Sequence, residues 1–142
     1  MKHKKLLAVL TMVCILFCCV AVVAHAYQAD YVSGSAGHGV TGSGGLYISD
    51  GDFSTSASAD TSISSVNAYR ILSVSVYIDP NNPNIEDGDY ADNSYSGNDY
   101  IQVNASTGTI YNGAEAGGTH SIYFIDSDGR YGSWGDSTFW SN

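Results

Sequence analysis

Apolar or small side chains alternate with polar ones along much of this chain. A repeat of two residues places successive side chains on opposite faces of a β-strand. Between residues 53 and 64 the pattern therefore predicts a half-buried strand. Its two faces are Phe53, Thr55, Ala57, Ala59, Thr61 and Ile63, predicted to face the core, and Ser54, Ser56, Ser58, Asp60, Ser62 and Ser64.

The segment Tyr69–Ile78 carries the strongest strand pattern. Its predicted core face comprises Leu72, Val74, Val76 and Ile78. Pro80 cannot donate a hydrogen bond to a neighbouring strand and favours an extended turn at the residue before it. Asp79-Pro80 is therefore predicted to end the strand.

Shorter strand patterns recur through the rest of the chain. They cover Tyr100–Asn104, Thr109–Tyr111, Thr119–Asp126, Arg130–Trp134 and Thr138–Trp140. No segment after residue 26 shows a convincing helical repeat. Six to eight short strands, separated by turns rich in Gly, Asn and Asp, predict an all-β fold. We expect a single small β-sandwich of the immunoglobulin-like or jelly-roll-like kind.

Two segments lack a strand pattern. Ser33–Gly45 is rich in glycine and is expected to form a flexible loop or an irregular first layer. We assign residues 27–45 to a Gly/Ser-rich segment ahead of a sandwich domain over residues 46–142. Within it, Gly37–Gly42 matches the dinucleotide motif GxGxxG, but neither the preceding strand nor the following helix is expected, which argues against nucleotide binding. The second loop is Asn81–Asn98, rich in Asn, Asp, Gly and Ser.

Residues 1–26 have the pattern of a secretory signal peptide. A basic stretch over 2–5 precedes an uncharged, mostly apolar run over 6–23, and small residues stand at Ala24 and Ala26. This order predicts export and cleavage after Ala26. An uncleaved membrane anchor is the alternative, because the apolar run approaches the length that spans a bilayer.

Loss of this leader would change the character of the protein. All lysines and all three cysteines lie within it, so the mature chain would contain neither a thiol nor a disulfide. A lipoprotein signal is disfavoured because Phe17, not a small residue, precedes Cys18. Arg70 and Arg130 would face fourteen acidic residues, a net charge of −12 instead of −9. Such a charge disfavours nucleic-acid partners and membrane insertion of the mature chain, and it favours cation binding.

The acidic segment between Asp79 and Asp99 is the candidate metal-binding region. Calcium binds six to eight oxygen ligands, which carboxylates and amides supply. The spacing is not that of an EF-hand, so a site would be irregular, and a solvated acidic loop is the alternative. Asp126-Ser127-Asp128-Gly129 is a weaker second candidate whose alternative is a plain hairpin turn. Calcium is the one cofactor considered, and its candidate ligands are Asp79, Glu86, Asp87, Asp89 and Asp92.

Catalytic chemistry has little support in the sequence. His38 and His120 are the only histidines after residue 26, and no serine lies in a GxSxG motif. His120 shares a predicted strand face with Ile122 and Phe124, which favours a partly buried structural histidine over a general base. A pair of carboxylates can hydrolyse a glycosidic bond, but among fourteen acids such a pair is uninformative. We therefore expect no enzymatic activity.

Aromatic residues are the strongest indication of a binding surface. Rings flanked by polar residues can stack on sugars or anchor a protein partner. Core packing is the alternative, and we expect it to include Phe139, one tryptophan and several tyrosines. The candidate ligand-binding residues are Tyr95, Tyr131, Trp134 and Trp140.

These patterns together favour a binding function outside the cell. We expect a small, secreted, non-enzymatic β-sandwich protein that binds a glycan or a protein at or near the cell surface. It would be released, or held at the cell envelope by non-covalent contacts. A secreted toxin-like or bacteriocin-like antagonistic factor is the second hypothesis, and a small extracellular hydrolase is the third.

Overall fold

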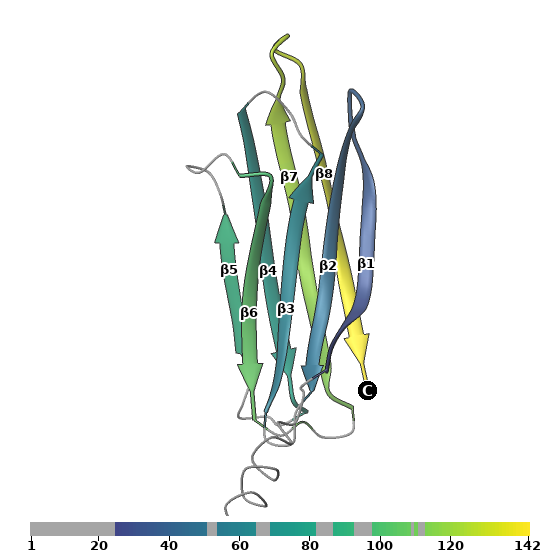
Figure 1. The fold of residues 1–142 in the computed structure, drawn as a ribbon, viewed down its shortest axis with the longest axis vertical. Coiled ribbons are helices and arrows are strands. Elements are labelled where there is room, and N and C mark those ends of the chain that lie inside the picture. The colour runs from purple at the N-terminus through teal and green to yellow at the C-terminus, as the bar shows by residue number, and fades with distance from the viewer. Residues whose placement is uncertain are drawn as a thin grey trace, which may run out of the picture.

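Eight β-strands form two antiparallel sheets that face one another (Figure 1). The computed structural model describes residues 25–50, 54–64, 69–81, 87–92, 98–108, 110 and 113–142. The order is β1-β2-β3-β6 in sheet A and β5-β4-β7-β8 in sheet B. This small β-sandwich confirms the predicted all-β class. The strands are β1 His25–Gly37, β2 Val40–Asp50, β3 Thr55–Ile63, β4 Tyr69–Asp79, β5 Asp87–Asp92, β6 Tyr100–Thr107, β7 Glu115–Ile125 and β8 Tyr131–Ser141.

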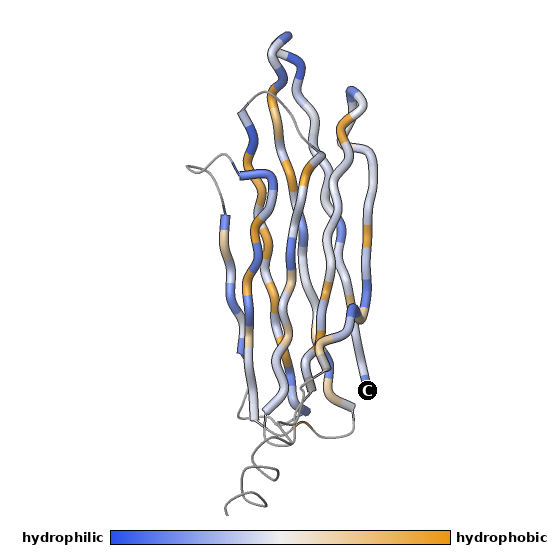
Figure 2. The backbone as a smooth tube through the Cα atoms, in the orientation of Figure 1, coloured by the Kyte–Doolittle hydropathy of each residue, from blue (hydrophilic) through white to orange (hydrophobic). Residues whose placement is uncertain are grey.

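The two strongest strand predictions are confirmed. Every second residue of β3 is buried, beginning at Thr55, and the intervening residues are partly exposed. β4 ends at Asp79, as the following proline predicted, and it buries Leu72, Val74, Val76 and Ile78. Figure 2 shows hydrophobic positions recurring along the strands as separate orange segments, which is the alternation read from the sequence.

The prediction of a flexible loop at Ser33–Gly45 is wrong. This segment forms the turn of the β1–β2 hairpin and the adjoining parts of both strands, and the turn includes His38 with a positive φ of 53°. The glycines are required by packing across the sandwich. A Cβ on Gly34 or Gly42 would overlap the ring of Trp134 in sheet B. The absence of side chains, which suggested a flexible loop in the sequence, is what lets the sheets approach here.

Two other boundaries also differ from the predictions. The expected loop Asn81–Asn98 contains β5, an edge strand whose residues are mostly exposed. Hydrogen bonding to β4 holds these polar residues in a strand, but their sequence has no apolar alternation from which the strand could be predicted. The expected short strands Arg130–Trp134 and Thr138–Trp140 are parts of the single strand β8.

Some predictions fall on parts of the chain that the structure does not describe. Of the expected signal peptide, residues 1–24 lie outside the described residues. Of the expected strand Thr109–Tyr111, only Ile110 is described. The described ranges contain no helix long and apolar enough to cross a membrane.

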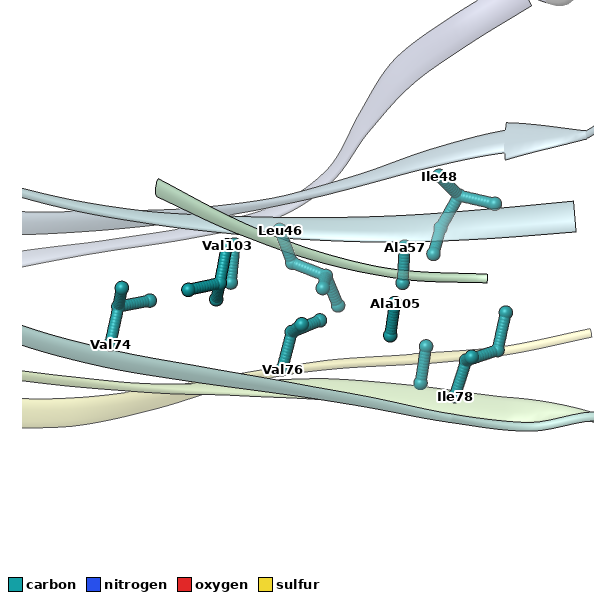
Figure 3. Packing of buried hydrophobic residues seen from close by; sticks show 10 residues of the cluster. Leu46, Ile48, Ala57, Val74, Val76, Ile78, Val103 and Ala105 are labelled. Carbon is teal, nitrogen blue, oxygen red and sulfur yellow. The ribbon is translucent and has the colours of Figure 1, made fainter. Parts of the chain in front are cut away.

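Side chains from both sheets fill the interior as two clusters with a polar layer between them. That layer consists of the buried residues Thr61, His120 and Thr138. Along β3, for example, Thr61 stands between Ala59 of one cluster and Ile63 of the other. Cluster 1, shown in Figure 3, is Leu46, Ile48, Ala57, Ala59, Val74, Val76, Ile78, Val103, Ala105 and Ala116. Cluster 2 is Ala36, Val40, Ile63, Leu72, Ile122 and Phe124.

A carboxylate bridges the two sheets along each side of the sandwich. Where β1 lies beside β8, Asp30 Oδ2 accepts a hydrogen bond from the backbone N–H of Phe139 at 2.9 Å. Where β5 lies beside β6, Asp87 Oδ2 accepts one from the backbone N–H of Ser106 at 2.8 Å (Figure 1). Edge strands present N–H groups that can pair with other chains. Asp30 and Asp87 each occupy one such donor.

Candidate functional site

The predicted metal ligands do not converge in the described residues. Asp79 ends β4, where its carboxylate accepts a hydrogen bond from a backbone N–H at 2.7 Å. On β5, strand alternation places Asp92 on the opposite face from Asp87 and Asp89. Glu86 lies outside the described residues. Among the residues that are described, no three His, Cys, Asp or Glu side chains could together hold a metal ion.

The weaker acidic candidate at residues 126–129 has the geometry of a hairpin turn. The Asp126 carboxylate accepts hydrogen bonds from the backbone N–H groups of Asp128 and Arg130, both at 2.9 Å, and from Arg130 Nε at 2.8 Å. Desolvation acts to raise the pKa of Asp126, but these hydrogen bonds and the charge of Arg130 together lower it below its ordinary value. The carboxylate is therefore committed to the turn that joins β7 to β8.

The predicted ligand-binding aromatics are divided between core and surface. Trp134 packs against cluster 2 and Trp140 against cluster 1, and both are half-buried. Tyr131 is 74% exposed at the start of β8, and Tyr95 lies outside the described residues. The expectation that Phe139 belongs to the core is wrong, because it is 51% exposed on the outer face of sheet B.

A different group of aromatic residues comes together on the outer face of sheet A. One row of paired residues crosses its four strands: Tyr31 on β1, Gly45 on β2, Asp60 on β3 and Gln102 on β6. A β-bulge at Ala29 shifts the β1 register just before Tyr31. Because the bulge adds one residue, it turns Tyr31 outward and leaves Asp30 facing sheet B.

Two more tyrosines lean into this row from opposite sides. β2 and β6 run in the same direction, because each is antiparallel to β3. On β2, Tyr47 comes two residues after the row residue Gly45. On β6, Tyr100 comes two residues before the row residue Gln102. The Tyr47 ring lies over Gly45, where a Cβ would come within 3.0 Å of three of its atoms. The Tyr100 hydroxyl donates to Oε1 of Gln102 at 2.9 Å. We call Tyr31, Tyr47, Asp60 and Tyr100 the tyrosine–aspartate cluster.

Asp60 is the polar centre of the tyrosine–aspartate cluster. Its Oδ1 accepts a hydrogen bond from the backbone N–H of Gly45 at 3.2 Å, and the Tyr47 hydroxyl donates to the same carboxylate. Burial, and then the charge of Asp60, raise the pKa values of Tyr47 and Tyr100 above the ordinary value of a phenol. These two tyrosines are therefore neutral hydroxyl donors beside a carboxylate at physiological pH.

The rest of this outer face is polar and accessible. Tyr31 and Tyr100 are 53% and 49% exposed. The described residues enclose no pocket. Hydroxyl and amide side chains surround the cluster on the same face: Ser33, Ser43, Ser56, Ser58, Ser62, Gln102 and Asn104.

Sheet B also carries outward-facing aromatic residues, and they form two groups near its two ends: Tyr77 and Phe139 on either side of Gly117, and Tyr69, Tyr123 and Tyr131. Tyr77 lies across Gly117 near one end of the sheet, and Tyr123 pairs with Ile71, six residues further along β4. Six residues of strand correspond to about 20 Å. The hydroxyls between these tyrosines bond to one another across β4 and β7, as in the 2.6 Å pair of Ser75 and Thr119. On sheet A, by contrast, tyrosines from three strands surround a single carboxylate, that of Asp60.

His120 has the structural role that the sequence favoured. Its Nδ1 lies 3.1 Å from Oγ1 of Thr61, which itself donates to a backbone carbonyl, and its Nε2 lies 2.9 Å from Oγ1 of Thr138. Burial lowers the pKa of His120, and a hydrogen bond to the Asp60 backbone, followed by the charges of nearby carboxylates, opposes that shift only in part. A neutral imidazole that donates from Nδ1 and accepts at Nε2 satisfies both threonines.

The tyrosine–aspartate cluster was not among the residues selected from the sequence. The β3 alternation did assign Asp60 to the polar face. However, Tyr31 and Tyr47 border or follow the glycine-rich segment, and the bulge that turns Tyr31 outward leaves no periodic signal. Alternation of Tyr47 with Leu46 and Ile48 was the one available indication that this ring faces away from the core.

The chain matches no protein-family model, no curated protein and no solved structure.

Proposed function

We propose that this protein is a small, secreted, non-enzymatic module that binds a glycan at or near the cell surface through the outer face of sheet A. The observation that carries the proposal is the convergence of Tyr31, Tyr47 and Tyr100 around Asp60 on an exposed sheet. Each tyrosine combines an apolar ring with a polar hydroxyl. The proposed export rests on the signal-peptide pattern of residues 1–26.

The chemistry of this face supports a glycan rather than a protein ligand. A sugar ring has an apolar C–H face that packs on an aromatic ring, and its hydroxyls require polar partners around that ring. Gln102, Asn104 and the serines of β2 and β3 provide such partners beside the tyrosines. Protein interfaces, by contrast, are centred on desolvated apolar contacts. The described outward positions of β2, β3 and β6 carry no aliphatic side chain larger than threonine.

The strand connectivity supports the immunoglobulin-like alternative for the finer fold class. Immunoglobulin domains place strands A, B and E in one sheet and C, F and G in the other, with C′ beside C in variable-type domains. The orders β2-β3-β6 and β5-β4-β7-β8 correspond to A-B-E and C′-C-F-G. We infer that β1 is an additional N-terminal strand, and it is this strand that brings Tyr31 to the site.

Retention on immobilised polysaccharides tests the proposed function. We expect the purified protein to be retained by one or more members of a panel of neutral, N-acetylated, amine-bearing and acidic cell-wall polysaccharides. Tyr31→Ala/Tyr100→Ala should weaken retention by about tenfold or more, since truncating central aromatic contacts often costs more than 1 kcal/mol each. The control Tyr90→Ala/Tyr131→Ala removes two exposed tyrosines of sheet B and should bind like the wild type.

Two results would contradict this proposal. Wild-type protein that is retained by no polysaccharide, but captured by a purified cell-surface protein, would place the protein among protein-binding modules. Equal losses in the sheet A and sheet B variants would show that the tyrosine–aspartate cluster is not the site. Replacing Trp134 or Trp140 is a poorer test, because both rings pack against the core.

A further inference from the structure

The Asp60 carboxylate places a negative charge within the tyrosine–aspartate cluster, and a neutral sugar has no cationic group that could pair with it. It lies in the third of the four positions of the row, and none of the three ion pairs among the described residues includes it. Those pairs join Arg70 to Asp99 and Arg130 to Asp126 and Asp128. In the described part of the chain, both arginines are thus engaged elsewhere and Asp60 has no cationic partner.

We propose that the tyrosine–aspartate cluster binds glycans that carry protonated amino groups, that is, polymers of de-N-acetylated hexosamine. The inference rests on the proposed glycan-binding function and specifies its ligand class. A ligand ammonium group at the row would form a charge-assisted hydrogen bond with the Asp60 carboxylate. The same group would lie close to the electron-rich faces of the tyrosine rings, which attract cations.

The geometry of the cluster fits a cation on a sugar better than an isolated ion. Tyr47 and the Gly45 N–H already donate to the Asp60 carboxylate and fix its position, while Tyr31 and Tyr100 stand exposed beside it. A carboxylate has about four acceptor positions. Asp60 therefore retains acceptor capacity for an ammonium group after these two contacts, and the exposed rings remain available for the sugar.

The charge of the whole protein favours the same ligand class. After loss of the leader, two arginines would oppose fourteen carboxylates. This negative charge would repel polysaccharides that carry sulfate or uronic acid groups and attract polysaccharides that carry protonated amino groups. Charge attraction alone would not distinguish sheet A from sheet B, so the experiment needs a control that changes net charge equally.

Calorimetric titration with two hexamers of the same length provides the test. One is β-1,4-linked N-acetylglucosamine, and the other is its fully de-N-acetylated counterpart at a pH where the amines are protonated. We expect the amine form to bind the wild-type protein about tenfold or more tightly than the acetylated form, which corresponds to about 1.4 kcal/mol. Raising the pH until the amines are neutral should remove the preference.

The matched variants are Asp60→Asn and Asp92→Asn. Asp92 also lies beside a tyrosine hydroxyl, that of Tyr90 at 3.5 Å, but it belongs to sheet B. Both substitutions remove one negative charge, and only Asp60→Asn should abolish the preference for the amine form. Circular dichroism confirms that each variant is folded, and the comparison of the two ligands on the wild type does not depend on any variant.

The outcomes separate this inference from the proposed function. Equal binding of both hexamers, or a preference that survives in folded Asp60→Asn, would overturn the amine specificity while leaving glycan binding intact. Tighter binding of the acetylated form would do the same. If neither these hexamers nor any polysaccharide of the panel binds, both proposals are wrong.

Discussion

Gly44→Ala is the substitution that most directly tests the packing across the sandwich. Gly44 lies in β2 opposite the buried ring of His120, and a Cβ there would come within 2.7 Å of three atoms of that ring. Real Cβ atoms do not approach that closely, so either the strand or the ring must move. The strand is constrained because Gly44 pairs with Val32 on one side and Thr61 on the other. The ring is therefore expected to move.

The expected loss of stability in Gly44→Ala follows from the packing and the hydrogen bonds that the displaced His120 ring would lose. Forcing an extra methyl group into a close-packed core typically costs about 1–3 kcal/mol. Movement of His120 also breaks its hydrogen bonds to Thr61 and Thr138, and each buried group left unpaired costs about 1–3 kcal/mol. These contributions sum to about 3–9 kcal/mol, and partial relaxation of the core favours the lower end, so we expect a loss of about 3–5 kcal/mol in the free energy of unfolding. For a domain of this size that is a decrease in Tm on the order of 12–20 °C.

Urea and thermal unfolding, followed by circular dichroism, measure this loss. The control is Gly108→Ala, because a Cβ at Gly108 meets no atom within 4 Å, and its effect should stay within about 1 kcal/mol. Combining Gly44→Ala with His120→Ala removes the overlap. The double variant should therefore be more stable than the sum of the two single losses by about 1–3 kcal/mol. If Gly44→Ala alone unfolds within about 1 kcal/mol of the wild type, the placement of His120 against β2 is wrong.

Three further predictions concern pH, strand edges and metal. Burial lowers the pKa of His120, so the folded state binds fewer protons than the unfolded chain. The free energy of unfolding should therefore decrease as pH falls below about 6.5. When this free energy is measured against pH, His120→Gln should show a smaller decrease than the wild type. Asp30→Ala frees the backbone N–H of Phe139 and should speed thioflavin-positive association, whereas Asp89→Ala, with the same change in charge, should not; equal rates would remove the protective role of Asp30. Tm should be the same in excess calcium and in EDTA, because the described carboxylates of β4 and β5 do not converge, and a calcium-dependent rise of several degrees would contradict that reading.

The sequence predicted strands well where one face is buried and the other is polar. β3 and β4 are such strands, and their buried faces match the predicted residues. The same rule missed β5 because its residues are almost all exposed, so no alternation marks it. It also missed the β1–β2 hairpin, where glycines replace the expected apolar residues because Trp134 and His120 occupy the space in front of them. The partner of each glycine is far away in sequence, and only the fold brings them together.

The candidate site was less accessible to sequence reasoning than the fold. The four members of the tyrosine–aspartate cluster come from four strands and span residues 31 to 100, so no short motif contains them. Their assembly depends on the bulge at Ala29 and on the pairing of β3 with β6, which is not a hairpin. The sequence correctly favoured a structural role for His120, because its neighbours Ile122 and Phe124 share one strand face. Trp134 and Trp140, by contrast, were chosen for their residue type, and packing places both against the core.

Amide chemical-shift mapping locates a bound ligand on the protein surface, so it tests whether the ligand binds on the outer face of sheet A. A two-dimensional ¹⁵N–¹H spectrum would be recorded while the de-N-acetylated hexosamine hexamer is added. We expect the largest shift changes on the tyrosine–aspartate cluster and its row, at Tyr31, Gly45, Asp60, Tyr100 and Gln102. Changes concentrated on β4, β7 and β8, or spread evenly over the acidic surface, would contradict it.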